Sequence, residues 1–128
     1  MAEHGSFVWN ELATSDVEGA KSFFGELLGW SFRDMNMGGQ GTYTVIQSGD
    51  KDAGGMMSLA NIDAPGVPPH WMSYIAVDDV DARTGKVVAL GGKVMREPFD
   101  IPNVGRMSVI ADPSGAVVCL MTIAQQDG

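Results

Sequence analysis

The sequence has little cysteine and little positive charge, and each shortage excludes a class of protein. Its 128 residues include a single cysteine, Cys119, so no disulfide can form within the chain. Lysine and arginine number 8 against 16 aspartates and glutamates, which gives a net charge of −8. Because such a chain repels phosphate backbones and anionic membrane surfaces, we expect neither nucleic acid nor a membrane as a partner. The acidity itself is explained by solubility.

Long apolar runs and a basic leader are also missing. No stretch is long enough to span a bilayer, and the start MAEHGSF has no basic or apolar region of a signal peptide. With one cysteine, this favours the cytoplasm. The sequence has no G-x-S-x-G, P-loop or C-x-x-C motif. Hydrophobic residues still make up 45% of the chain, enough for the core of a single domain spanning residues 1–128.

The stretch TSDVEGAKSFFGELLGW, residues 14–30, predicts a capped helix between two strands. Its apolar residues recur at three- and four-residue spacing on one helix face: Val17, Ala20, Phe23, Phe24, Leu27 and Leu28. Ser15 or Asp16 is expected as the N-cap, and Ser15 with Glu18 fits a capping box. Gly29 suits a left-handed C-cap.

The same plan returns in DDVDARTGKVVALGGKV. Asp79 corresponds to Asp16, and Gly92 corresponds to Gly29 at the same sequence offset. Two copies are too few for a solenoid and instead predict one domain built from two similar halves. We expect one half at about residues 5–60 and the other at about 70–124, joined by the proline-rich linker 61–69.

Each half is expected to contain a strand, a helix and three further strands. The eight predicted strands are Phe7–Ala13, Trp30–Met35, Thr42–Ser48, Ala53–Leu59, His70–Val77, Lys93–Phe99, Val104–Ala111 and Ala116–Ile123. The second predicted helix, Asp79–Leu90, is weakened by Gly85. Asp112 to Gly115, DPSG, is a tight turn. Because strands outnumber helices and the hairpins are antiparallel, the class is α+β.

Three segments in this order resemble the vicinal oxygen chelate superfamily of glyoxalase I, bleomycin-resistance proteins and extradiol dioxygenases. They are LATSDVEGAKSFFGELLGW, VDDVDA followed by LGGKV, and DPSGAVVCLM, and the resemblance covers nearly the whole chain. It implies two βαβββ modules in tandem, each a curled mixed sheet with its helix outside, enclosing a cavity. It also implies a homodimer, since many chains of this length in the superfamily pair symmetrically.

Metalloenzymes of that superfamily hold their metal with four residues, usually His and Glu. The resemblance places these ligand positions at Trp9, Met56, Met72 and Cys119, none of which has an imidazole or a carboxylate. It therefore implies no metal and no cofactor. A slip of two residues would put the imidazole of His70 in place of Met72. A copper(I) site on the sulfur atoms is formally open, but methionine is more often an apolar filler.

Glu11 is the candidate catalytic residue. Strand alternation places it on one face with Phe7 and Trp9, where lost hydration would raise the pKa of its carboxyl unless a partner compensates. Tyr74 stands at the equivalent place in the second half. Alternatively, Glu11 pairs with Arg106 or lies at the exposed end of its strand. The simplest role for Arg106 itself is a salt bridge at the rim.

Three functions remain open. The first is a small-molecule binding protein whose apolar or amphipathic ligand contacts Trp9, Glu11, Met56, Met72, Tyr74 and Cys119. The second is a glyoxalase- or isomerase-type enzyme in which Glu11 carries a proton. The third is an interaction module without a functional pocket. Cys119 is expected to be a buried, inert thiol. Three aromatic residues are expected in the core or at the rim: Tyr43, Trp71 and Phe99.

Overall fold

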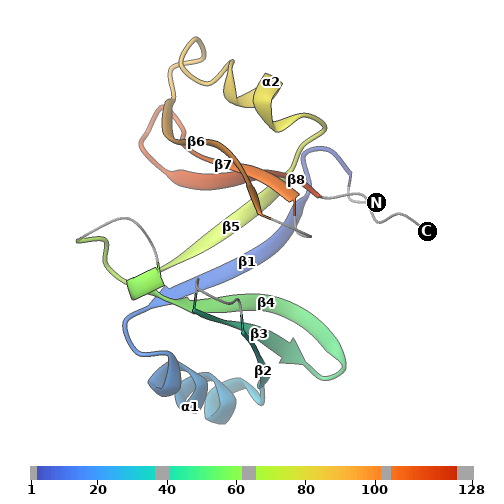
Figure 1. Cartoon of the computed structure of the whole chain (residues 1–128), viewed down its shortest axis with the longest axis vertical. Coiled ribbons are helices and arrows are strands. Elements are labelled where there is room, and N and C mark those ends of the chain that lie inside the picture. Colours follow the sequence, from blue (N-terminus) through green and yellow to red (C-terminus); the bar gives the residue numbers. More distant parts are fainter. Residues whose placement is uncertain (1–2, 37–40, 62–65, 102–104, 124–128) are drawn as a thin grey trace. The chain divides into compact units, whose positions relative to one another are not determined.

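A computed structural model describes residues 3–36, 41–61, 66–101 and 105–123, and these contain eight strands and two α-helices (Figure 1). This confirms the α+β class. The chain divides into two compact units, one of residues 9–72 and the other of residues 1–8 with 73–128. The modules expected at residues 5–60 and 70–124 stay a prediction. Neither α-helix in the described ranges is long and apolar enough to cross a membrane.

The unit of residues 9–72 is a four-stranded sheet with one helix. Its elements are β1 (Phe7–Thr14), α1 (Val17–Leu28), β2 (Ser31–Asn36), β3 (Thr42–Ser48), β4 (Lys51–Ser58) and the 3-10 turn η2 (Leu59–Asn61). The strands are hydrogen-bonded in the order β2-β3-β4-β1. The pairs β2–β3 and β3–β4 are antiparallel, while β1 runs parallel to β4.

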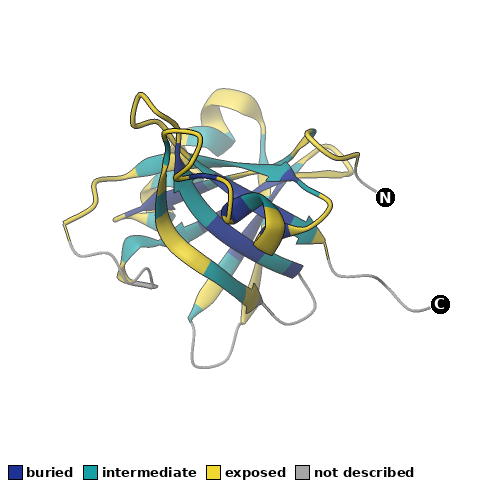
Figure 2. Ribbon diagram, turned by 90° about the horizontal axis from the view of Figure 1, so that it is seen from above, coloured by how far each residue is buried: buried dark blue, intermediate teal, exposed yellow. Residues whose placement is uncertain are grey.

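The core of this unit lies between the sheet and α1. Leu12, Ile46 and Met56 form a buried cluster, with apolar residues of α1, of β2 and of the link between them packed against it: Val17, Ala20, Phe24, Trp30 and Phe32. Most buried residues of the chain lie on strands, as Figure 2 shows. The predicted apolar face of the helix is therefore only partly covered. Phe23 and Leu27 are 60% and 62% exposed.

The N-terminus of α1 is capped by Asp16 and not by a capping box. The Asp16 carboxylate accepts a hydrogen bond from the backbone N–H of Gly19 at 2.9 Å. Glu18 instead accepts from the Lys21 ammonium, so the prediction that pairs Ser15 with Glu18 is wrong. Asp16 and Ser15 are both good cap residues, and the side chain that reaches the free N–H decides between them. Gly29 ends the helix at φ 73°, as expected.

Asp16→Ala should lower the free energy of unfolding by about 1 kcal/mol, because it removes the acceptor of an otherwise unpaired N–H group. Chemical denaturation measures this loss. Ser15→Ala is the matched control and should change stability far less. A larger loss for Ser15→Ala than for Asp16→Ala would contradict the cap that the structure places at Asp16.

The other unit, of residues 1–8 with 73–128, has the same order of elements as the unit of residues 9–72. It contains β5 (His70–Ala76), α2 (Val80–Thr84), β6 (Lys93–Ile101), β7 (Gly105–Ala111) and β8 (Val117–Ile123). The strand order is β5-β8-β7-β6, with β5 parallel to β8. All eight strand predictions are confirmed to within two residues at each described end. Val104 and residues 62–65 of the expected linker lie outside the described residues.

The second helix is shorter than predicted. It has five residues and ends at Thr84, where Gly85 is the C-cap, so the expected helix Asp79–Leu90 is wrong in length. Beyond Gly85 the chain continues in tighter turns, with the N–H of Val87 bonded to the carbonyl of Thr84. Glycine is a poor residue for a helix interior, which explains the early end. The DPSG turn forms as predicted, with Gly115 at φ 97° and its N–H bonded to the Asp112 carbonyl.

Candidate functional site

The candidate site lies on the face of the β2-β3-β4-β1 sheet opposite α1. Leu12 faces the helix and belongs to its core cluster. Side chains alternate along a strand, so Trp9 and Glu11 lie on the other face. In the parallel pair, Glu11 stands beside Gly55 and Leu12 beside Met56. Gly55 therefore shares the face of Glu11, and Met56 does not.

Met56 is a core residue, which corrects its prediction as a neighbour of Trp9 on a ligand-binding wall. It is 0% exposed and packs with Leu12 and Ile46. The constant sequence offset that relates the two halves does not hold on β4. Glu11 pairs with Gly55, whereas its equivalent Tyr74 pairs with Cys119, which the offset had matched to Met56. A difference of one residue along a strand reverses the face on which a side chain lies.

A hydrogen-bonded group on this face joins β1 to β3. The Trp9 indole Nε1–H donates to the Tyr43 hydroxyl at 2.9 Å. A Cβ atom built on Gly55 would overlap that hydroxyl, so the Tyr43 ring lies directly over the backbone of β4. Because Gly55 is the register partner of Glu11, the hydroxyl and the carboxylate are neighbours. We call Trp9, Glu11, Tyr43 and Gly55 the Glu11 cluster.

The protonation of Tyr43 follows from these surroundings. Burial, and after it the negative charge of Glu11, raise the pKa of Tyr43 far above its usual range. The hydroxyl therefore keeps its proton and donates a hydrogen bond to the Glu11 carboxylate. Trp9, Glu11 and Tyr43 are each only half-buried, so the cluster retains some access to solvent.

Tyr43 is the residue that the sequence analysis missed as part of the site. It was expected only in the core or at the rim. Two signals could have pointed to it. The strand TYTVIQS alternates, so Tyr43 and Val45 share a face, and the adjacent strand carries Gly54 and Gly55. Glycine inside a strand often marks a place where another group approaches the backbone closely.

The other predicted ligand contacts are on β5 and β8. Met72 and Tyr74 are half-buried, and Cys119 is 2% exposed and stands beside Tyr74 in the parallel register. Their role as ligand contacts stays a prediction. The Nδ1 atom of His70 lies 2.8 Å from the carbonyl oxygen of Pro68. One of the two ring nitrogens of His70 is therefore engaged by the backbone.

No group of three or more His, Cys, Asp or Glu side chains that could hold a metal ion occurs within the ranges that the structure describes. That the site holds no metal stays a prediction for this chain. It is drawn from the residue types at the four ligand positions of the superfamily.

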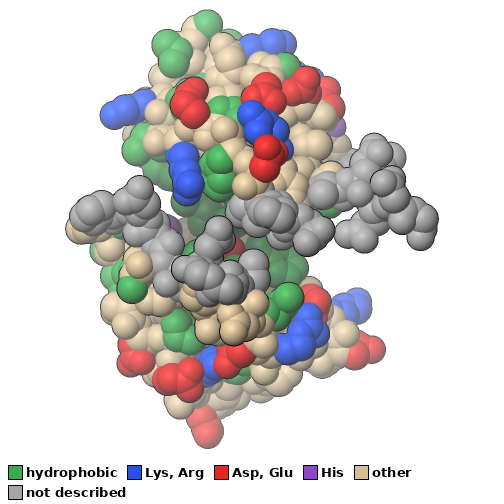
Figure 3. All heavy atoms as spheres, viewed as in Figure 1, with side chains coloured by type: hydrophobic (Ala, Val, Ile, Leu, Met, Phe, Trp, Pro, Cys, Tyr) green, Lys and Arg blue, Asp and Glu red, His purple; other side chains and the backbone are tan. Residues whose placement is uncertain are grey.

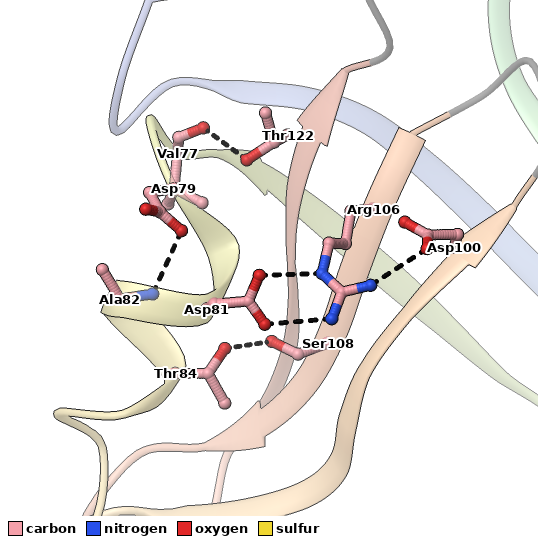
Figure 4. A network of polar contacts seen from close by, with 9 residues as sticks. All are labelled: Val77, Asp79, Asp81, Ala82, Thr84, Asp100, Arg106, Ser108 and Thr122. Atoms are coloured by element: carbon pink, nitrogen blue, oxygen red, sulfur yellow. Dashed lines mark hydrogen bonds and ion pairs between the residues drawn. The ribbon is translucent and has the colours of Figure 1, made fainter.

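Arg106 forms salt bridges to Asp81 and Asp100 within its own unit. This agrees with the salt-bridge role that was the simplest expectation for Arg106 itself. Figure 4 shows its guanidinium bonded to both carboxylate oxygens of Asp81 and to Asp100, at 2.8 to 3.0 Å. Next to this group, the buried hydroxyls of Thr84 and Ser108 are 2.8 Å apart. The guanidinium lowers the pKa of Asp81. These contacts fasten α2 to β7. On the face in Figure 3, acidic and basic side chains similarly lie intermixed.

Comparison with protein families decides the membership of the chain. Residues 6–120 match the model of the Glyoxalase/Bleomycin resistance protein/Dioxygenase superfamily. This chain belongs to that superfamily. The vicinal oxygen chelate resemblance is thereby confirmed.

Two curated relatives are similar over nearly all of this superfamily member. "Putative glyoxylase CFP32" of Mycobacterium tuberculosis is 41% identical over 124 residues, which are 97% of this chain and 46% of that protein. "Anthracycline biosynthesis protein DnrV" of Streptomyces peucetius is 32% identical over 136 residues, covering 97% of this chain and 49% of that protein. The chain thus spans about half the length of the curated relatives that it matches.

Solved structures of other superfamily members share the fold. Methylmalonyl-CoA epimerase from Mycobacterium tuberculosis aligns with a TM-score of 0.65 at 17% identity, over 98% of this chain and 93% of the epimerase. Homoprotocatechuate 2,3-dioxygenase from B. fuscum aligns with a TM-score of 0.61 at 14% identity, over 98% of this chain and 35% of the dioxygenase. At these identities the likeness concerns the fold alone.

Proposed function

We propose that this superfamily member binds a small apolar or amphipathic molecule at the Glu11 cluster. The observation that carries the proposal is the hydrogen bond from Trp9 to Tyr43, whose hydroxyl meets the Glu11 carboxylate. An indole ring beside an oriented carboxylate offers a ligand one apolar surface and one polar anchor. A relative named for anthracycline biosynthesis fits a role in handling small molecules. The proposed location is the cytoplasm, since the chain has one cysteine.

A thermal-shift screen with apolar and amphipathic metabolites tests this proposal. A ligand that binds the folded state raises the midpoint of unfolding by mass action. A module that serves only protein interactions and has no functional pocket would give no such rise. Consistent absence of stabilisation across the screen would favour that alternative over binding.

Trp9 should report ligand binding by its fluorescence. Trp9→Phe should lose the change in emission that a ligand causes, because the indole is part of the Glu11 cluster. Trp30→Phe should keep the change, since Trp30 packs against Phe24 in the helix-side core, with ring centroids 5.2 Å apart. The measurement is emission during titration with a hit from the screen. Loss of the signal in Trp30→Phe alone would contradict the proposed site.

An isomerase or glyoxalase-type enzyme is the second candidate function. The observation that favours it is the donation of the Tyr43 hydroxyl to Glu11, since an acceptor carboxylate is the form that can take a proton. In such an enzyme, Glu11 would move a proton at a carbon next to a carbonyl. Solvent deuterium entering that carbon of a bound compound, and failing to enter it in Glu11→Gln, distinguishes this enzyme from a binding protein.

We also propose that two copies of the chain associate through the exposed apolar residues of α1. Phe23, Leu27 and Leu28 are each more than half exposed on this one helix. The proposed partner of this apolar surface is a second copy of the chain. The curated relatives have about twice the length of this chain, so their additional residues could cover the equivalent surface within one protein. Exposed apolar patches commonly mark interaction surfaces.

Sedimentation at tens of micromolar should therefore give a homodimer, and Leu27→Glu should shift it toward monomer because a charge cannot be buried unpaired at low cost. Leu90→Glu is the matched control, because Leu90 is also apolar and 74% exposed but lies outside α1. A monomeric wild type would rule out the dimer. An equal shift in both variants would place the contact elsewhere.

A further inference from the structure

The guanidinium of Arg96 lies over the ring of Phe99. Both residues are on β6, which is an edge strand, and the Cζ atom of Arg96 is 3.7 Å from the centroid of the ring. This is a van der Waals contact distance, and the electrostatic attraction between a cation and the face of an aromatic ring stabilises it. Arg96 is exposed and Phe99 is half-buried. The ring therefore holds a positive charge at a defined place on the protein surface.

This pair lies on the face of its sheet that α2 does not cover. Asp100, the residue after Phe99, bonds to Arg106, which in turn bonds to α2 (Figure 4). Because side chains alternate along a strand, Phe99 points to the opposite face. The register partner of Arg96 is Val109, which is half-buried. Val109 also pairs with the predicted ligand contact on β8, so Arg96 and that contact share a face.

The first half of the chain contains an equivalent arginine, Arg33. The sequence offset that relates the two halves matches Arg33 to Arg96, both are on edge strands, and each stands beside a valine of the neighbouring strand. The guanidinium of Arg33 pairs with the carboxylate of Asp52 at 3.6 Å. Gly115 and Ala116 stand at the corresponding place in the second half. The second half thus has the arginine but not its acidic partner.

The Arg96 side chain forms no ion pair within the described residues. In the same ranges, Arg33, Arg83 and Arg106 each pair with an aspartate. The ring of Phe99 has no oxygen or nitrogen atom, so it offers no such acceptor to the five N–H donors of the Arg96 guanidinium. These donors form a planar fork that matches the two oxygens of a carboxylate.

We propose that Arg96 anchors the carboxylate of a small molecule whose apolar body lies along Val109 and Phe99. Stacking on the ring limits the conformations of the Arg96 side chain, so less conformational entropy is lost when the carboxylate binds. One guanidinium balances one negative charge in a chain whose net charge is −8, which favours a carboxylate over a dianionic phosphate. The site uses residues of one unit only, and the inference does not rest on the binding proposed at the Glu11 cluster.

Equilibrium dialysis at low ionic strength with two probes of the same shape, 2-naphthoate and 2-naphthamide, tests the site. The wild type should bind the naphthoate about tenfold more tightly, because only its carboxylate can form a charged pair with the guanidinium. In Arg96→Gln this preference should fall below about twofold, since the amide carries no charge. Arg96→Lys should keep only part of the preference, because lysine retains the charge and loses the planar fork.

Arg33→Gln is the matched control. It removes the equivalent arginine and the same charge, but Arg33 already has Asp52 as its partner. The preference for naphthoate should therefore stay as in the wild type. The anchor at Arg96 is overturned if the wild type binds both probes alike or binds neither. It is also overturned if Arg96→Gln keeps the preference, or if Arg33→Gln loses as much of it.

A third probe, 2-naphthyl phosphate, tests the choice of carboxylate. It has the same ring system and a second negative charge, which the acidic chain repels. It should bind to the wild type no more tightly than 2-naphthoate. Tighter binding that is lost in Arg96→Gln would overturn the carboxylate as the ligand group of this site.

Discussion

Glu11→Gln should weaken the binding of a ligand found in the thermal-shift screen by about 1–3 kcal/mol, roughly 5- to 150-fold, and should abolish any turnover. The substitution keeps the shape of the side chain and removes its charge, so the Tyr43 hydroxyl loses a charged acceptor. The magnitude is that of a hydrogen bond to a charged group, or of a buried polar group left without its partner.

Isothermal titration of the wild type and the variant measures this loss. Glu26→Gln is the matched control, because Glu26 is an exposed glutamate on α1, across the sheet from the Glu11 cluster. It should bind like the wild type. If Glu11→Gln binds as tightly as wild type and folds as stably, Glu11 has no role in recognition, and the ligand would be held by shape and apolar contact alone.

Met56→Ala should lower the free energy of unfolding by about 2–5 kcal/mol. The side chain is completely buried between Leu12 and Ile46, and its removal leaves a cavity under α1 in addition to the lost burial. This effect is a large fraction of the total stability of an ordinary domain. Urea denaturation measures it as a lower midpoint at an unchanged slope.

Met57→Ala separates the two faces of β4. Met57 is the register partner of Tyr43, is half-buried and lies on the face of the Glu11 cluster. Replacing Met57 should cost less stability than replacing Met56, yet it should weaken binding of the ligand found in the thermal-shift screen more. The opposite pattern, with Met56→Ala near neutral in stability and impaired in binding, would restore Met56 as a ligand contact and contradict the register.

Local signals in the sequence were enough for the elements of the fold and for the family. The helix from Val17 to Leu28 follows from its apolar spacing and from the Gly29 cap, and the turn at Asp112 follows from its proline and glycine. The helix, its cap and the turn each depend on residues that are close together in the sequence. They can therefore be predicted without knowing which distant segments pack against them. The choice between Ser15 and Asp16 depended on which side chain reaches the free N–H of Gly19, and α2 ends at Thr84 because Gly85 follows it.

The composition of the site depended on the register between strands that are distant in the sequence. The residues themselves indicate that Trp9 and Glu11 share a face, because alternation is local to one strand. Only the pairing of β1 with β4 shows that Gly55, and not Met56, joins them, since a shift of one residue exchanges the two faces. Likewise, Tyr43 approaches Glu11 because β4 carries a glycine between them, and this contact between three strands exists only in the folded sheet.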